Sequence, residues 1–171
     1  LWFHVDGAFG AWTRIADAPW NALVDGIDRA DSIGLDFHKW MSVQYDCGLV
    51  LMRDEARQRA AFAARPAYLE PHHAGLAGGE PWFCDYGIDL SRGFRALKVW
   101  ATLRSYGRET LGAMITANCR LAVRMGELVN ATPELTLAHP VRSNVCCFSV
   151  AAPNGTDPSA LNRDIVQQLQ L

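Results

Sequence analysis

Two short apolar runs of the sequence each end in side chains that can perform chemistry. The run LWFHVD ends at Asp6, and the run DSIGLDF is followed directly by His38 and Lys39. Both runs are typical of buried strands in a parallel sheet. Ligands of open α/β sheets bind outside the carboxyl ends of the strands. The sequence therefore predicts that an acid, Asp6, and an amine, Lys39, converge on one crevice.

An acid and an amine in one crevice suit a particular aldehyde cofactor. A lysine amine forms a Schiff base with an aldehyde, and pyridoxal 5′-phosphate (PLP) also needs a carboxylate beside its ring nitrogen. That carboxylate keeps the nitrogen protonated, so that the ring withdraws electrons from a substrate carbanion. We therefore expect Asp6 and Lys39 to hold PLP. The alternative for Lys39 alone is a solvated residue at a strand end, because lysines are mostly exposed.

Three longer motifs occur in order: WFHVDGAFGAW, ADSIGLDFHKWMSVQYDCGLVLMRD and YGIDLSRGFRALKVWATLRSYG. Together they resemble the group II PLP-dependent decarboxylases, the family of aromatic-L-amino-acid and glutamate decarboxylases. The resemblance implies an α/β fold of the aspartate-aminotransferase-like type, fold type I. Residues 1–105 would be the C-terminal part of the PLP-binding large domain, with a flexible loop at 65–88. Residues 106–171 would be the connecting helix and the start of the small α+β C-terminal domain.

The resemblance also implies an activity and a set of roles. The activity is decarboxylation of an L-amino acid, a carboxy-lyase reaction, through an internal aldimine on Lys39. Asp6 would pair with the pyridinium nitrogen, Ala8 would lie against one face of the ring, and His38 would lie near the cofactor phosphate and imine. The family's animal members often carry Asn at position 36 to help hold the phosphate, so Asp36 is a departure at a cofactor-binding position.

The 65–88 loop bears on the outcome of the reaction. In the family this loop carries a tyrosine that protonates the carbanion left after carbon dioxide departs, and aldehyde-forming relatives carry phenylalanine there. Counting back from SRGFR places Phe83 close to that position, with Tyr86 three residues on. An aldehyde synthase, which couples decarboxylation to oxidative deamination, is therefore the alternative within the family.

The resemblance leads us to expect that the chain is a fragment. Family members carry a ring-stacking histidine and a Ser/Thr-rich phosphate cradle before the HVD strand, and this chain holds neither. We expect Leu1 to begin within a domain and the small domain to continue past Leu171, so that the fragment alone is inactive. The full-length protein is expected to be a homodimer.

Composition limits the other classes of function. The chain of 171 residues carries 16 Lys plus Arg against 18 Asp plus Glu and has no basic stripe, which argues against nucleic-acid binding. No apolar stretch approaches the roughly 20 residues that cross a bilayer. The five cysteines include no CxxC pair, and two of them lie in NVCCFSV, which we expect to be a buried strand. These features favour a cytoplasmic protein with reduced thiols.

Two further classes of function remain open: a metal-dependent hydrolase and a non-enzymatic interaction domain. HVD and DFH could each offer a metal a carboxylate and an imidazole, as in a metal-dependent hydrolase. That interpretation leaves Lys39 and the later motifs without a role, and we expect no metal. A non-enzymatic α/β interaction domain would need no convergence of Asp6 and Lys39. His4 could be either a site residue or a histidine of the core.

The remaining segments predict a regular order of elements. NALVDGIDRA is expected to form a short helix, CGLVLMRD a third strand and EARQRAAFAA a helix. From Ser91 a helix should run to a stop at YG (residues 106–107), and a second helix should run to about Val129. ELTLAHP should form a strand, and DPSALNRDIVQQL should open a helix with Asp157 as N-cap and Pro158 in its first position.

Overall fold

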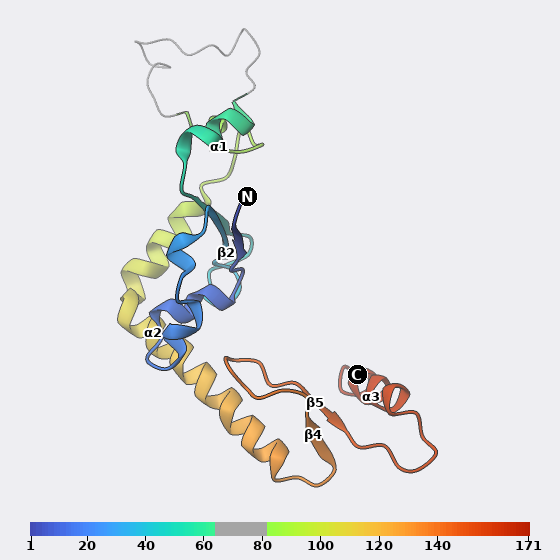
Figure 1. Ribbon diagram of the computed structural model, residues 1–171. Coiled ribbons are helices and arrows are strands. Elements are labelled where there is room, and N and C mark those ends of the chain that lie inside the picture. Colours follow the sequence, from blue (N-terminus) through green and yellow to red (C-terminus); the bar gives the residue numbers. More distant parts are fainter. Residues whose placement is uncertain (64–81) are drawn as a thin grey trace, which may run out of the picture. The chain divides into compact units, whose positions relative to one another are not determined.

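The computed structural model describes residues 1–63 and 82–171 (Figure 1). These residues form two compact units, which are described separately below. The first unit comprises Leu1–Phe9 and Gly26–Ser105, and the second comprises Gly10–Asp25 and Tyr106–Leu171. The elements, with η for 3-10 helices, are β1 (His4–Asp6), η1 (Gly10–Ile15), η2 (Trp20–Val24), η3 (Ile27–Arg29), β2 (Ser32–Asp36), β3 (Gly48–Met52), α1 (Glu55–Phe62), η5 (Phe83–Tyr86), α2 (Arg95–Asn130), β4 (Leu135–Leu137), β5 (Phe148–Val150) and α3 (Pro158–Gln168).

The first unit is built on a sheet in the order β1-β2-β3. β1 pairs in parallel with β2, with Asp6 opposite Gly34, and β3 pairs antiparallel with β2, with Gly48 opposite Asp36. The three predicted strands are therefore present. The expectation that β1 is buried is wrong, because His4 and Asp6 are exposed and β3 also keeps much of its surface accessible. β2 is the most buried of the three strands, since it alone has a neighbour on both sides.

The long helix α2 contains the break that the sequence predicts at residues 106–107. Gly107 has φ 72° and ψ 167°, a conformation outside the helical region that glycine adopts without the steric cost of a side chain. The helical residues before the break belong to the first unit and those after it to the second. The expected helix stop is confirmed, and a second run of helix follows it to Asn130.

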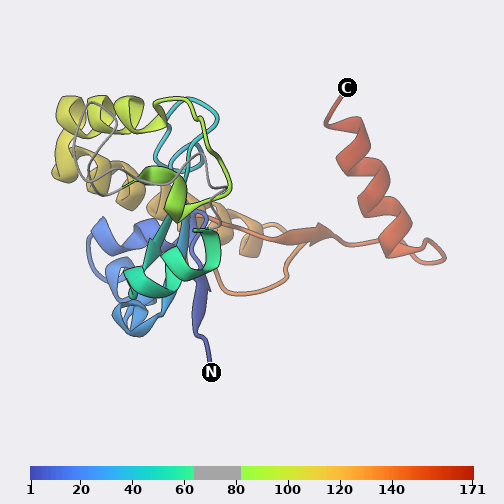
Figure 2. The ribbon, with the colours of Figure 1, turned by 90° about the horizontal axis from the view of Figure 1, so that it is seen from above.

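The second unit is centred on the part of α2 that follows Gly107. Its buried side chains recur at helical spacing, which places them on one stripe of the helix. At Thr116 a hydroxyl accepts a hydrogen bond from the Asp17 backbone N–H at 2.9 Å, which ties the segment after η1 to α2. Figure 2 shows η1 and η2 as neighbouring turns in blue. The buried residues of the stripe are Leu111, Gly112, Ile115, Thr116, Cys119, Ala122, Gly126 and Val129.

Two expectations about local structure are wrong. NALVDGIDRA forms no single helix, because Gly26, at φ 89°, separates η2 from η3. NVCCFSV is no buried strand: β5 begins only at Phe148, which is 38% exposed, and Cys147 before it is also exposed. β5 has β4 as its partner in a two-stranded sheet, so little of the segment is paired or covered.

The C-terminal helix α3 begins as the sequence predicts. Asp157 is its N-cap and accepts a hydrogen bond from the Ser159 backbone N–H at 3.0 Å, and Pro158 occupies the first turn. Asn162 of α3 bonds both backbone groups of Val150, which attaches α3 to β5. Within the described ranges, no helix is both long enough and apolar enough to cross a membrane.

Candidate active site

The candidate site lies at the edge where β1 and β2 both end. Pairing of the two chain segments continues beyond the strands, because the Gly7 N–H donates to the Gly34 carbonyl at 2.9 Å and the Asp36 N–H donates to the Ala8 carbonyl at 3.0 Å. These bonds hold the Asp6–Ala8 segment beside the end of β2. The parallel pairing of β1 with β2 thus brings the two predicted strand ends to one edge of the sheet.

The turn after β2 fixes the backbone of Lys39. The Phe37 N–H donates to the Cys47 carbonyl at 2.9 Å, the Val43 N–H to the Phe37 carbonyl at 3.0 Å, and the Ser42 N–H to the Lys39 carbonyl at 3.1 Å. Apolar side chains on both sides of Lys39 are buried and anchor this turn, whereas the Lys39 side chain is 48% exposed. The anchoring residues are Phe37, Trp40, Met41 and Val43.

The Lys39 amine forms an ion pair with Asp36. Lys39 Nζ lies 2.7 Å from Asp36 Oδ2. This hydrogen bond to the carboxylate is the main reason why the pKa of Lys39 is raised and the pKa of Asp36 is lowered. Desolvation opposes both shifts but is the weaker effect. The structure therefore places Asp36, which the resemblance associates with the cofactor phosphate, against the amine itself.

The His38 ring is oriented by the chain segment that follows the turn. The Cys47 backbone N–H donates to His38 Nδ1 at 2.9 Å. Because Nδ1 accepts, the neutral ring carries its proton on Nε2, which lies 3.9 Å from Asp36 Oδ2. The Tyr45 ring packs edge-on against the His38 ring, with the ring centroids 4.4 Å apart. His38 thus presents an N–H toward the carboxylate that also holds Lys39.

The Asp6 carboxylate is exposed at the end of β1. Its Oδ1 accepts a hydrogen bond from the Ala8 backbone N–H at 3.1 Å, which sets its orientation. Asp6 lies close enough to Lys39 to contribute to raising the pKa of the amine. The acid and the amine that the sequence predicted to converge therefore lie in one electrostatic neighbourhood. His4 is held differently, because its Nδ1 lies 2.7 Å from the Ser32 hydroxyl.

Sequence analysis missed several residues that support the site. Cys47 orients His38 through its backbone and Tyr45 packs on the ring, as described above. Asp46 between them pairs with Arg95 at 3.2 Å, and this contact lowers the pKa of Asp46 and raises that of Arg95. The signal was available, since these residues form the YDCG stretch that follows HKW. What the motif alone did not show is that its backbone holds the histidine.

The loop expected at 65–88 is described only from residue 82, and residues 64–81, with His72 and His73, lie outside the described residues. The described part contains η5, which packs on α1. Asp85, 1% exposed, pairs with Arg59 at 3.2 Å, and the Gln58 side-chain amide donates to the Tyr86 carbonyl at 2.9 Å. The Tyr86 hydroxyl donates to Glu55, whereas Phe83 is 73% exposed. We call these contacts between α1 and η5 the clasp.

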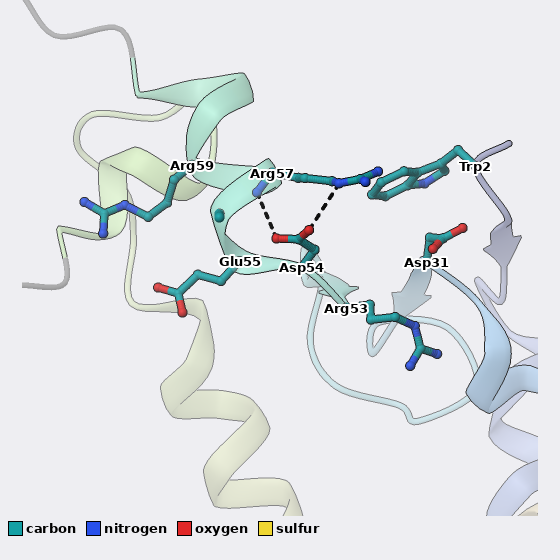
Figure 3. Close-up of a pocket in the computed structure, with 8 residues that line it drawn as sticks. Trp2, Asp31, Arg53, Asp54, Glu55, Arg57 and Arg59 are labelled. Carbon is teal, nitrogen blue, oxygen red and sulfur yellow. Dashed lines mark hydrogen bonds and ion pairs between the residues drawn. The ribbon is translucent and has the colours of Figure 1, made fainter.

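A large hollow of about 980 Å³ lies at the other end of the strands (Figure 3). It is lined by residues that precede β1 and β2 and by residues that follow the antiparallel β3. The guanidinium of Arg57 pairs with Asp54 at 3.1 Å and lies 5.8 Å from the centroid of the Trp2 ring. The guanidinium of Arg53 donates to the Ala30 carbonyl. This hollow is thus distinct from the edge that carries Lys39. The guanidinium groups of Arg53 and Arg57 in it already contact other residues of the chain.

The described residues do not offer the complete ligand set that a metal-dependent hydrolase needs. In residues 1–63 and 82–171, no three side chains of His, Cys, Asp or Glu come together in a way that could hold a metal ion. His38 and Asp36 lie at the same edge, but Asp36 is paired with Lys39 and His38 Nδ1 is occupied by a backbone N–H. The geometry favours an amine-centred site over a metal-centred one.

Comparison with known proteins identifies the family of the chain. The model of the pyridoxal-dependent decarboxylase conserved domain matches residues 1–151. Aromatic-L-amino-acid decarboxylase of Drosophila simulans is 35% identical over 95% of this chain and 31% of the relative, and phenylacetaldehyde synthase of Arabidopsis thaliana is 31% identical over 96% of this chain and 33% of the relative. The crystal structure of Oryza sativa TDC with PLP and tryptamine matches with a TM-score of 0.85 and 28% identity, over 98% of this chain and 35% of that one.

The chain belongs to the pyridoxal-dependent decarboxylase family. This confirms the resemblance that the three motifs indicated. It also confirms the fold class: the chain holds part of an α/β fold of type I. The chain spans about a third of the length of the relatives that it matches.

Proposed function

We propose that the protein catalyses PLP-dependent decarboxylation of an L-amino acid and is a carboxy-lyase. The observation that carries the proposal is the placement of the Lys39 amine and the Asp6 carboxylate at the carboxyl ends of two adjacent parallel strands. Membership of the pyridoxal-dependent decarboxylase family supports the same reaction.

The residues at this edge fit the chemistry of PLP. Lys39 presents a half-exposed amine on an anchored turn, and Asp6 presents an exposed carboxylate. Gly34 lies opposite Asp6 and carries no side chain, so β2 presents only backbone to Asp6 at that position. When bound, PLP supplies an electron-withdrawing ring that accepts the electron pair released as the substrate carboxylate departs as carbon dioxide.

We infer the following roles for the residues of this chain. Lys39 would bond covalently to the cofactor aldehyde, and Asp6 would hold the proton on the ring nitrogen. Ala8 would lie beside the ring, where its small side chain would leave room for a flat group. His38, whose ring is fixed by the Cys47 backbone, would present its Nε2–H to the cofactor. We count Asp36 among the cofactor-binding residues because its carboxylate contacts the Lys39 amine.

The proposal also covers the substrate, the domain organisation, the oligomeric state and the cellular compartment. Relatives named for aromatic amino acids and a structure that contains tryptamine favour an aromatic L-amino acid. We infer that residues 1–105 belong to the PLP-binding large domain and residues 106–171 to the connecting helix and small domain of a homodimeric, cytoplasmic enzyme. In support of a reducing compartment, the cysteines of the described chain form no disulfide.

The test is to express the complete gene product, add PLP, reduce with borohydride and map the modified peptide by mass spectrometry. We expect an absorbance band of a protein-bound Schiff base and a pyridoxyl group on Lys39. A panel of L-amino acids is then assayed for carbon dioxide and amine. Labelling at another lysine, or release of amine without dependence on PLP, would contradict the proposal.

A second candidate, an aldehyde synthase of the same family, is favoured by the residues of η5. Phe83, which the sequence places close to the position of the proton-donating tyrosine, has no hydroxyl and is largely exposed. The nearby Tyr86 hydroxyl donates its hydrogen bond to Glu55. The assay separates the two outcomes: a decarboxylase releases carbon dioxide and amine, whereas an aldehyde synthase releases carbon dioxide, aldehyde, ammonia and peroxide.

A further inference from the structure

We propose that Asp36 is a positioning residue that holds Lys39 as a protonated, ion-paired side chain and so sets the pH at which the amine becomes a nucleophile. The inference deepens the proposed function and rests on it only for the identity of the carbonyl compound, the cofactor aldehyde. It assigns to Asp36 a role toward the amine, in addition to any role in cofactor binding.

The geometry gives this role to Asp36 because both partners are held by their backbones. Asp36 ends β2, and its N–H is bonded to the Ala8 carbonyl at 3.0 Å. Lys39 lies three residues on in the anchored turn, with its carbonyl bonded to the Ser42 N–H. The two side chains meet at 2.7 Å, a distance typical of a charge-assisted hydrogen bond.

Other charged groups face the amine, and their effects are weaker than that of Asp36. Asp6, from β1, and Tyr45, from the segment after the turn, each raise the pKa of Lys39 through space, while desolvation lowers it. His38 acts on the other partner and lowers the pKa of Asp36. Because contact with Asp36 has the largest effect, replacing this carboxylate should change the protonation of Lys39 more than replacing either of the others.

The chemical step shows why protonation matters. An ammonium nitrogen has no lone pair, so Nζ must lose a proton before it bonds to a carbonyl carbon. Of the three ammonium protons, two depart with the carbonyl oxygen as water when the C=N bond forms. The third passes to the Asp36 carboxylate or to solvent. Asp36 therefore disfavours the free amine and is also placed to accept its proton.

The experiment measures Lys39 alone, without the cofactor. The complete gene product, freed of cofactor, is treated with limiting acetic anhydride over a series of pH values, and acetylation of the Lys39 peptide is quantified by mass spectrometry. In this reaction the N–C bond forms, acetate departs and a proton is lost. We expect Asp36→Asn to move the rise in labelling to lower pH and to speed labelling at pH 8 by about three- to tenfold, since one pKa unit changes the free amine tenfold.

Matched variants separate charge from shape. Asp36→Glu keeps the negative charge and should stay closer to the wild-type profile than Asp36→Asn. Asp54→Asn removes a carboxylate that pairs with Arg57 at the other end of the strands, so the Lys39 profile should remain that of the wild type. A profile for folded Asp36→Asn that coincides with the wild type, or that moves to higher pH, overturns the inference.

A measurement on the wild type covers the case in which Asp36→Asn does not fold, as judged by circular dichroism. Labelling of Lys39 should then rise at higher pH in the native protein than in the same protein unfolded in urea, and an equal or lower midpoint overturns the inference. The outcome is independent of the proposed function. If borohydride fixes PLP at Lys39 but Asp36→Asn does not shift the labelling profile, only the present inference is contradicted. If Asp36→Asn shifts the profile but no PLP is fixed at Lys39, only the proposed function is contradicted.

Discussion

The carboxyl edge of β1 and β2 and the buried stripe of α2 hold their side chains by different means. At the edge, backbone hydrogen bonds fix the chain, and the Asp6 and Lys39 side chains project from it with much of their surface accessible, while Asp36 is partly buried. Along the stripe, packing fixes the chain, and Ile115 and Cys119 have no exposed surface. Burial also raises the pKa of the Cys119 thiol, which keeps it neutral.

This difference teaches which residues can be changed without loss of the fold. Side chains at the edge contribute charge and chemistry, and the backbone pairing that positions them does not depend on their identity. Side chains of the stripe contribute shape, because protein interiors are close-packed and tolerate little change of volume. Substitutions at the two regions should therefore separate activity from stability.

The largest effect is expected for Lys39→Ala. It removes the amine that would bond to the cofactor, so borohydride should fix no PLP at position 39 and release of carbon dioxide should fall to background. The melting temperature of the cofactor-free protein should stay unchanged, because the side chain is half exposed and the turn is anchored by its neighbours. A variant that still turned over substrate would remove Lys39 from the site.

Asp6→Asn should have the next largest effect, on turnover and not on folding. The amide keeps an oxygen for the Ala8 N–H but cannot stabilise a protonated ring nitrogen. We expect kcat to fall by about 100-fold, the scale of losing one preorganised electrostatic contact in the transition state. The dissociation constant of PLP, measured by fluorescence titration, should change much less. Equal losses in kcat and in cofactor affinity would argue for a binding role instead.

Gly112→Ala tests the stripe. A Cβ at this position would lie 2.2 Å from the Ile15 carbonyl oxygen, which belongs to the backbone and cannot turn aside. Alanine improves helix propensity by about 1 kcal/mol, but overpacking costs about 1–3 kcal/mol or more. We expect net destabilisation, seen as a lower midpoint in urea. Gly93→Ala is the control, since nothing lies within 4 Å of its Cβ position, and an equal response of the two variants would contradict the packing argument.

The smallest effect is expected for Asp157→Ala at the start of α3. The change removes the side-chain acceptor of the Ser159 N–H, and loss of such a cap costs about 1 kcal/mol. Hydrogen exchange of the first turn of α3 should become faster. Asp164→Ala, a change of the same charge farther along the helix, should leave that turn unaffected. If both variants exchange alike, the cap contributes nothing measurable.

Local sequence patterns predicted most of the elements. The strands that end at Asp6 and Asp36, the break in α2 at Gly107 and the cap at Asp157 were all visible, because each depends on a few neighbouring residues. The convergence of Asp6 and Lys39 on one edge was also predictable, since the carboxyl ends of adjacent parallel strands meet. The roles of these two residues stay predictions.

What the sequence did not predict depends on contacts between distant segments. The orientation of β3 is set by its pairing with β2, and the exposure of β1 and β3 depends on how many neighbours a strand has. Strand periodicity does not predict the ion pair between Asp36 and Lys39, because the turn that joins them has no periodic pattern. The signal that does indicate the pair is the three-residue spacing of an acid and a lysine across a turn.

The clasp between α1 and η5 has a consequence for protein engineering. Because Glu55, Gln58 and Arg59 hold η5, the chain before residue 64 and the chain after residue 81 are tethered to one another within the first unit (Figure 1). These contacts define two graft junctions, at which segments taken from decarboxylase or aldehyde-synthase relatives would be inserted. Chimeras built in this way would ask how far the interval between the junctions alone directs the fate of the product.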